Sequence, residues 1–160
     1  IANALYNYGD EKRSRIIAIT IKKYLQNNEI NTTLDLANLI STVVKPGKNK
    51  HPATRSFQAI RIVINDELKK LSEALDQSIG ALSTNGRLAI ITFHSIEDRI
   101  VKQFIRKHSR PKELLKGLPI RTDDNSQCIL KDLGKIKPSR QEILSNRRSR
   151  SAILRLVEKC

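Results

Sequence analysis

His94 and Ser95 follow the apolar run 88–93, and this order of residue types predicts a strand that ends in polar side chains. Open α/β sheets place their ligands at the carboxyl ends of strands, so we expect Phe93, His94 and Ser95 to line a substrate pocket. The aromatic ring would stack on a base, and the imidazole and hydroxyl would meet polar atoms. A simpler alternative is that Ser95 only caps the next helix and His94 is an ordinary hydrogen-bonded residue.

The His-Ser pair does not indicate a hydrolase. Adjacent side chains rarely point toward each other, and the chain contains no G-x-S-x-G segment. Glu97 and Asp98 fall in the first turn of the predicted helix, where carboxylates more often meet the helix dipole than act as acid and base. Asp98 would complete a capping box with Ser95. The sequence has no glycine-rich phosphate loop, and we expect no metal site.

Two groups of basic residues predict contacts with a polyanion. The formal net charge is +14, which favours nucleic acid as a partner through neutralisation of phosphates. The first group surrounds His51 and comprises Lys45, Lys48, Lys50, Arg55 and Arg61. The second group precedes a predicted strand and comprises Arg147, Arg148 and Arg150. The simpler alternative is that these basic residues only form a solvated surface. For Arg150, an ion pair with Glu97 or Asp98 is as good an interpretation as a contact with a polyanion.

Helical elements are expected before the strand. One helix covers residues 10–26 with Asp10 as its cap, and a second runs from Thr32 or Thr33 to the stop at residues 45–47. Apolar residues then recur at steps of three and four from Pro52 to about Ser83. This pattern predicts one long helix, or two helices with a break at residues 65–66.

The second part of the chain has the pattern of an α/β sheet. A turn at residues 84–86, with a positive φ at Gly86, leads into a strand that we expect to be covered on both faces. A helix from Ser95, a long loop at 109–126, and strands at 128–130 and 152–157 follow. Helix, turn, strand and helix in succession predict a parallel sheet.

Several absences bound the class of protein. No apolar run approaches the roughly 20 residues of a membrane span, and no signal peptide is visible. Cys128 and Cys160 lie far apart and indicate a reducing compartment. The chain contains no Met, so we expect it to be a piece of a longer protein.

Three segments together resemble a known family. They are residues 51–68, which begin His-Pro-Ala-Thr-Arg-Ser-Phe, residues 92–102, which read Thr-Phe-His-Ser-Ile-Glu-Asp-Arg-Ile-Val-Lys, and residues 146–155. Their order and spacing, and the turn at residues 8–11, are similar to the MraW/RsmH family of S-adenosylmethionine-dependent methyltransferases. Arg147 stands where that family usually has Pro, and Ile96 where it usually has Leu.

The resemblance implies an α/β fold made of the C-terminal half of a doubly wound Rossmann-like methyltransferase sheet plus an inserted helical domain. Residues 1–66 would form the helical RNA-recognition insert, and residues 67–160 the C-terminal half of the methyltransferase domain. The family transfers a methyl group from S-adenosylmethionine to N4 of a cytosine in small-subunit ribosomal RNA. The half that binds the cofactor is missing from this sequence, so no cofactor-binding residue is assigned and the polypeptide alone is expected to be inactive.

The implied partner is small-subunit ribosomal RNA or the ribosomal subunit. The implied location is the cytoplasm, without membrane association. A homodimer is a further possibility that the resemblance does not decide. The expected RNA-binding residues are Lys50, His51, Thr54, Arg55, Arg61, Arg147 and Arg148. The catalytic residue is not assigned. The alternative function is a non-catalytic RNA- or ribosome-binding module, which would explain the basic groups equally well.

Overall fold

The computed structural model describes residues 1–47, 51–109 and 128–160. The chain divides into two compact units, residues 1–67 and 68–160, so the boundary lies one residue beyond the expected one. Lys48, Lys50 and most of the expected loop at 109–126 lie outside the described residues. Within the described residues, no helix is both long and apolar enough to cross a membrane.

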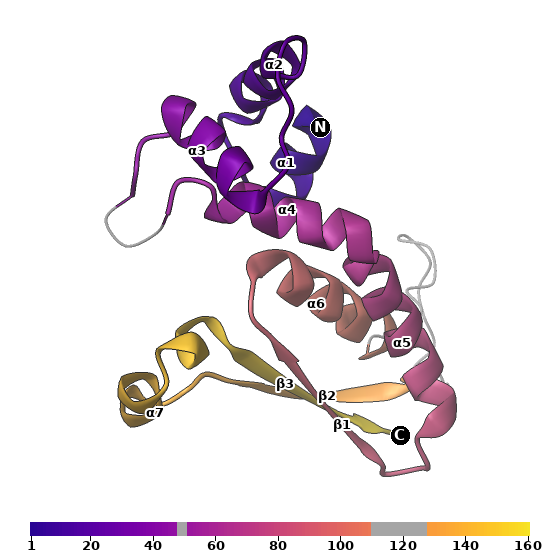
Figure 1. The fold of residues 1–160 in the computed structure, drawn as a ribbon. Helices are drawn as coiled ribbons and strands as arrows, with labels where there is room; N and C mark the ends of the chain where they lie inside the picture. Colours follow the sequence, from indigo (N-terminus) through magenta and orange to yellow (C-terminus); the bar gives the residue numbers. More distant parts are fainter. Residues whose placement is uncertain (48–50, 110–127) are drawn as a thin grey trace, which may run out of the picture. The chain divides into compact units, whose positions relative to one another are not determined.

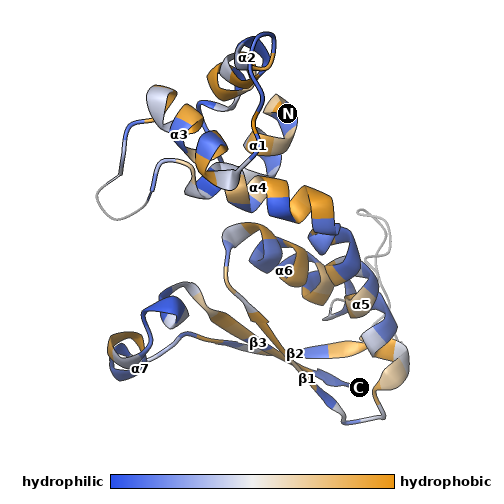
Figure 2. Cartoon of the chain, in the orientation of Figure 1, coloured by the Kyte–Doolittle hydropathy of each residue, from blue (hydrophilic) through white to orange (hydrophobic). Residues whose placement is uncertain are grey.

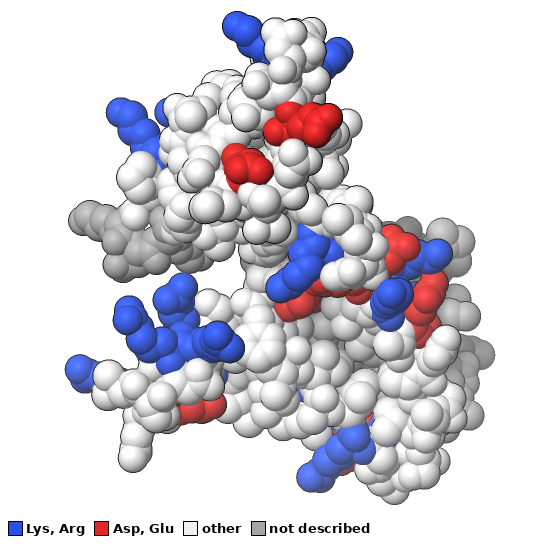
Figure 3. Space-filling view, viewed as in Figure 1, with Lys and Arg blue, Asp and Glu red and all other residues white. Residues whose placement is uncertain are grey.

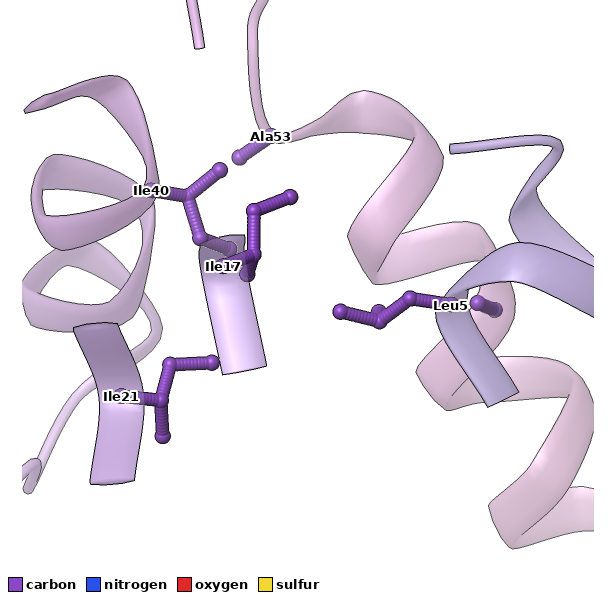
Figure 4. Close-up of a cluster of buried hydrophobic side chains, with 6 residues drawn as sticks. Leu5, Ile17, Ile21, Ile40 and Ala53 are labelled. Carbon is purple, nitrogen blue, oxygen red and sulfur yellow. The ribbon is translucent and has the colours of Figure 1, made fainter. Parts of the chain in front are cut away.

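The first unit is helical (Figure 1). Its elements are α1 (Ala2–Gly9), α2 (Ser14–Tyr24), α3 (Thr33–Val43) and α4 (Thr54–Asn65). Side chains from all four helices or their ends form one apolar core, in which Leu5, Ile17, Ile21, Ile40, Ala53 and Ala59 are buried. Figure 4 shows Leu5, Ile17, Ile21 and Ile40 converging with Ala53. The core therefore joins the start of α4 to the three helices that precede it.

Local signals explain where these helices start and stop. The Thr32 hydroxyl accepts from the Asp35 amide and the Asp35 carboxylate accepts from the Thr32 amide, so a capping box starts α3. The predicted helix over 10–26 is wrong at its start. Asp10 does not cap α2 but ends α1 in the left-handed region at φ 50°, and α2 begins at Ser14.

The long apolar pattern from Pro52 onward forms two helices. Asp66 has φ 52° and separates α4 from α5 (Glu67–Ala81). The break expected at residues 65–66 is therefore present, because Asn and Asp favour helix ends and tolerate the left-handed region.

The second unit contains helix α5 and a small sheet. After α5 its elements are β1 (Arg87–Thr92), α6 (Ser95–Ser109), β2 (Leu130–Ile136), α7 (Arg140–Ser145), the 3₁₀ helix η1 (Arg147–Ser151) and β3 (Ile153–Lys159). The expected strand at 128–130 is thus mostly displaced toward the C-terminus. The turn before β1 also differs from expectation, since Asn85 rather than Gly86 has the positive φ, at 63°.

The sheet is antiparallel, which corrects the expected parallel one. Its order is β1-β3-β2, and β3 pairs antiparallel with both neighbours. The last strand of the chain therefore lies between the two earlier ones. β1 and β2 still run parallel to each other, as strands joined through a helix do, and the local pattern could not show that β3 separates them.

One face of the sheet carries the core of this unit. Leu88 and Ile90 of β1 pack with Val157 of β3 against residues of α5 and α6, which lie on the same side of the sheet (Figure 1). The opposite face holds Ile91 and Ile136, which are 59% and 55% exposed. Figure 2 shows the hydrophobic stretches of β1 and β3 on this sheet. The expectation that both faces of β1 are covered is therefore wrong for the described residues.

Candidate functional site

Phe93, His94 and Ser95 lie where expected, at the carboxyl end of β1 and the start of α6. The Phe93 side chain is 56% exposed, so its ring is open to a ligand. The His94 side chain is mostly buried, at 15% exposed. Phe93 and Ser95 are therefore exposed on either side of the mostly buried His94.

Glu97 holds this turn in place. Its Oε2 accepts hydrogen bonds from the Phe93 amide at 2.8 Å and the His94 amide at 3.3 Å. The His94 Nδ1 in turn accepts from the Glu97 amide at 3.3 Å, and Nε2 lies 3.0 Å from Glu97 Oε1. His94 and Glu97 therefore hold each other in place at the start of α6.

The same contacts correct the predicted helix cap. The His94 carbonyl accepts the first bond of α6, from the Asp98 amide at 3.1 Å, and Ser95 is already the first helical residue. His94 is therefore the N-cap residue, and its ring Nδ1 accepts a hydrogen bond from the Glu97 amide. The expected capping box of Ser95 with Asp98 assumed a helix start one residue too late.

Asp98 is turned toward the sheet. Arg155 of β3 donates from Nε to Oδ1 at 2.8 Å and from an Nη to Oδ2 at 3.0 Å. These hydrogen bonds lower the pKa of Asp98 and raise the pKa of Arg155. Asp98 thus pairs with Arg155 and not with Arg150. The Arg150 side chain is exposed.

Arg147 and Arg148 lie in η1, and both are exposed. The Asn146 side chain accepts from the Arg148 amide at 3.1 Å, and buried Ser149 donates to the Asn146 carbonyl at 2.8 Å. Cationic side chains gather in this part of the second unit in Figure 3. Because Ile153 pairs with Thr92, η1 and the Phe93 turn flank the same end of the sheet.

In the helical unit, His51, Thr54 and Arg55 cluster at the start of α4, and all three are exposed. The His51 Nδ1 accepts from the Ala53 amide at 3.2 Å. Arg61 lies further along α4 and donates to both carboxylate oxygens of Glu67, at 2.8 and 3.1 Å. Arg61 is therefore paired with a carboxylate of its own unit, and its side chain remains 58% exposed.

Residues that the sequence pattern did not single out lie beside this cluster. Lys12 and Arg13, at the start of α2, line the same pocket as His51, Thr54 and Arg55. The end of α1 lies close to the backbone of α4, and this contact requires glycine at position 9. A Cβ atom at Gly9 would lie 2.5 Å from the Arg55 carbonyl oxygen. The turn at residues 8–11 was the only sequence signal, and it pointed to a family rather than to a pocket.

The fold and the site define a protein of mixed helix and antiparallel sheet in two compact units. The helical unit is basic, and the end of one strand carries an exposed aromatic residue near an arginine-rich turn. The chain belongs to the MraW methylase family, whose match covers residues 1–160. The family resemblance of the three sequence segments is thereby confirmed.

Curated relatives agree with this assignment. The chain is 60% identical over 159 residues to a protein of Vesicomyosocius okutanii named ribosomal RNA small subunit methyltransferase H, covering 99% of this chain and 52% of the relative. A protein of the same name from Ruthia magnifica is also 60% identical with the same coverage. One from Hamiltonella defensa is 49% identical over 164 residues. The chain thus spans about half the length of the curated relatives it matches.

Proposed function

We propose that the full-length protein carrying this chain is an S-adenosylmethionine-dependent methyltransferase that modifies N4 of a cytosine in small-subunit ribosomal RNA. The observation that carries the proposal is the match of the whole chain to the MraW methylase family. The names of the relatives support the ribosomal RNA substrate. A cytoplasmic location belongs to the same proposal.

The strand-end turn is suited to holding the target base. The exposed ring of Phe93 offers a stacking surface, and the clamp between His94 and Glu97 keeps the turn rigid. An amino group conjugated with a pyrimidine ring is a weak nucleophile, so orientation of the base contributes much of the rate enhancement. Phe93, His94 and Ser95 are therefore proposed to form the base-side wall of the pocket.

S-adenosylmethionine would supply the methyl group in such an enzyme. The turn after β1 is Phe-His-Ser, and no glycine-rich loop precedes α6. We therefore assign no residue of this chain to the cofactor.

The sheet supports the finer fold proposal, a doubly wound sheet with a helical insert. β1 has no partner strand on its outer edge among the described residues, and Ile91 on the open face is exposed. Doubly wound sheets can include an antiparallel strand, and β3 is antiparallel to both β1 and β2 here. We infer that further strands pair with β1 and that further helices cover Ile91.

RNA contacts are proposed for both units. In the proposed helical insert, residues 1–66, the proposed contacts are Lys50, His51, Thr54, Arg55 and Arg61. In the proposed C-terminal half of the methyltransferase domain, residues 67–160, they are Arg147 and Arg148. The exposure of His51, Thr54, Arg55, Arg147 and Arg148 supports five of these assignments, whereas the Arg61–Glu67 pair makes Arg61 the weakest contributor.

The test is transfer of a labelled methyl group from S-adenosylmethionine to small ribosomal subunits by the full-length protein. Arg55→Ala and Arg147→Ala should each lower the rate and make it more sensitive to salt. Arg87→Ala, at the other end of β1, serves as the control and should leave the rate unchanged. Binding of subunits without any methyl transfer would refute the enzyme and support a non-catalytic binding module.

A further inference from the structure

One pocket of the helical unit has a volume of about 500 Å³. It lies between residues 11–13 before α2, residues 44–47 after α3, and residues 51–55 at the start of α4, and we call it the α2–α4 pocket. Its lining includes Lys12, Arg13, Val44, Lys45, Pro52 and Arg55. All of these residues belong to one compact unit, so the pocket does not depend on how the two units are arranged.

The charge of the α2–α4 pocket is strongly positive. Four cationic side chains face one carboxylate, Glu11, which is only 4% exposed. Glu11 Oε1 accepts from the Arg13 amide at 3.0 Å, so this acid is engaged within the wall. An anion that enters the pocket would therefore meet a lining in which cationic side chains outnumber the one carboxylate.

The guanidinium groups are held while keeping spare donors. Arg13 Nη1 donates to the Val43 carbonyl at 2.6 Å, and Arg55 Nη1 donates to the Asp10 carbonyl at 3.5 Å. A guanidinium has five N–H donors, so each retains several for a ligand. Both arginines are thus positioned by the backbone of neighbouring elements, which favours contact with phosphate oxygens.

Two helices start at this pocket without an acidic residue in their first turn. Their N-cap residues, Arg13 and Ala53, form no capping hydrogen bond with their own side chains, although their amides donate to Glu11 Oε1 and His51 Nδ1. By contrast, α3 is capped by Thr32 and Asp35. The positive ends of α2 and α4 therefore add to the field of the four cations.

The volume and lining exceed what a single phosphate needs. Ligand sites for small molecules span roughly 300–1,000 Å³, and Val44 and Pro52 supply an apolar portion here. We propose that the α2–α4 pocket binds one phosphate-bearing nucleotide of RNA, with its phosphate against Lys12, Lys45 and Arg55. The sugar and base lie against Val44 and Pro52. The inference rests on the proposed function only in naming RNA as the source of the nucleotide.

The test uses the full-length protein and a fluorescently labelled single-stranded RNA with the target sequence, measured by anisotropy over a range of salt concentrations. Lys12→Gln and Lys45→Gln should each weaken binding several-fold and lower the slope of log affinity against log salt by about 1. Lys22→Gln, on the exposed surface of α2 and outside the pocket, is the matched control. Circular dichroism melting verifies that each variant folds, and both pocket lysines are exposed, so folding should be retained.

A second arm separates the sources of phosphate. Cytidine monophosphate and inorganic phosphate are titrated into the same proteins. If the pocket variants lose affinity for cytidine monophosphate but bind RNA like the Lys22→Gln control, the pocket serves a free nucleotide and the proposal is overturned. Unchanged binding of RNA by both pocket variants overturns it as well.

The methyl-transfer assay keeps the two proposals distinct. RNA binding that depends on Lys12 and Lys45, without any methyl transfer, would refute the proposed enzyme and leave the pocket assignment standing. Methyl transfer together with RNA binding that is unchanged in both lysine variants would refute the pocket proposal and support the proposed enzyme.

Discussion

Arg155 and Asp98 join the middle strand of the sheet to the first turn of α6 through two parallel hydrogen bonds of 2.8 and 3.0 Å. The side chains are 10% and 19% exposed, so the pair is largely shielded from water. Residues 57 positions apart in the sequence thereby hold α6 against the strand end that carries Phe93. This pair is a polar link between α6 and the sheet in the second unit.

Replacing Arg155 should destabilise the folded protein. Arg155→Met leaves Asp98 shielded without its partner, and we expect a loss of about 1.5–3 kcal/mol in the free energy of unfolding. The matched control is Arg87→Met, which breaks the Arg87–Glu158 pair of the same length, 2.8 Å, on a side chain that is 69% exposed. That change should cost only about 0–1 kcal/mol. Urea unfolding of the full-length variants measures both, and equal losses would contradict the role of burial.

The same pair predicts a specific acid sensitivity. Its hydrogen bonds lower the pKa of Asp98 from the ordinary value of 3.8. Below about that pH the unfolded chain binds a proton at Asp98 while the folded chain does not, so unfolding becomes more favourable. The stabilisation is complete above this range and is lost as the pH falls through the lowered folded-state pKa. Asp98→Asn should flatten the acid side of the stability curve, and an unchanged slope would refute this origin.

Glu97 should matter for both stability and activity. Glu97→Ala removes the acceptor for the Phe93 and His94 amides, and we expect a loss of about 1 kcal/mol together with a slower methyl transfer. Glu97→Gln keeps one carbonyl oxygen and should recover part of both. Thermal melting and the ribosomal-subunit assay provide the readouts. If Glu97→Ala left transfer at the full rate, the clamp would have no role in positioning Phe93.

Gly9 should not tolerate a side chain. A Cβ at this position would lie 2.5 Å from the Arg55 carbonyl oxygen, so Gly9→Ala must push α1 away from α4. We expect destabilisation by about 1–3 kcal/mol and weaker RNA binding through the displaced Arg55. At Gly80 in α5, a Cβ would meet no atom of the described residues within 4 Å, and Gly80→Ala should be neutral or stabilising by up to about 1 kcal/mol. Melting temperatures that fall equally would contradict the steric argument.

Cys160 should react slowly with alkylating agents. Its Sγ lies 3.2 Å from Cys128 Sγ, and this hydrogen bond raises the pKa of the Cys160 thiol. A raised pKa leaves less thiolate at a given pH, so alkylation is slower. Cys128→Ala should accelerate the reaction of Cys160 with iodoacetamide at pH 8, followed by mass spectrometry. A rate that stays the same or falls would show that Cys128 does not control the thiol.

The elements that sequence predicted well depend on local signals. Thr32 and Asp35 lie three residues apart and start α3 by themselves. The apolar run that ends at Phe93 placed β1 and its strand-end turn, and the Asn-Asp pair marked the break between α4 and α5. These interactions occur within a few residues, so a pattern in the sequence contains them.

The features that sequence missed depend on distant partners. The insertion of β3 between β1 and β2 follows from pairing between residues far apart in the chain, such as Thr92 with Ile153. The pairing of Arg155 rather than Arg150 with Asp98 depends on which face of β3 meets α6. The contribution of Lys12 and Arg13 to the α2–α4 pocket needed the packing of α1 on α4.

The outer edge of β1 has a practical consequence for handling this polypeptide. Backbone amides and carbonyls along residues 87–92 have no partner strand on that side within the described residues, and Ile91 stands exposed beside them. Such an edge is a template for pairing with another chain, and an apolar face strengthens the association. Expressed without further strands to cover it, the sheet unit is expected to self-associate into intermolecular sheets as its concentration rises.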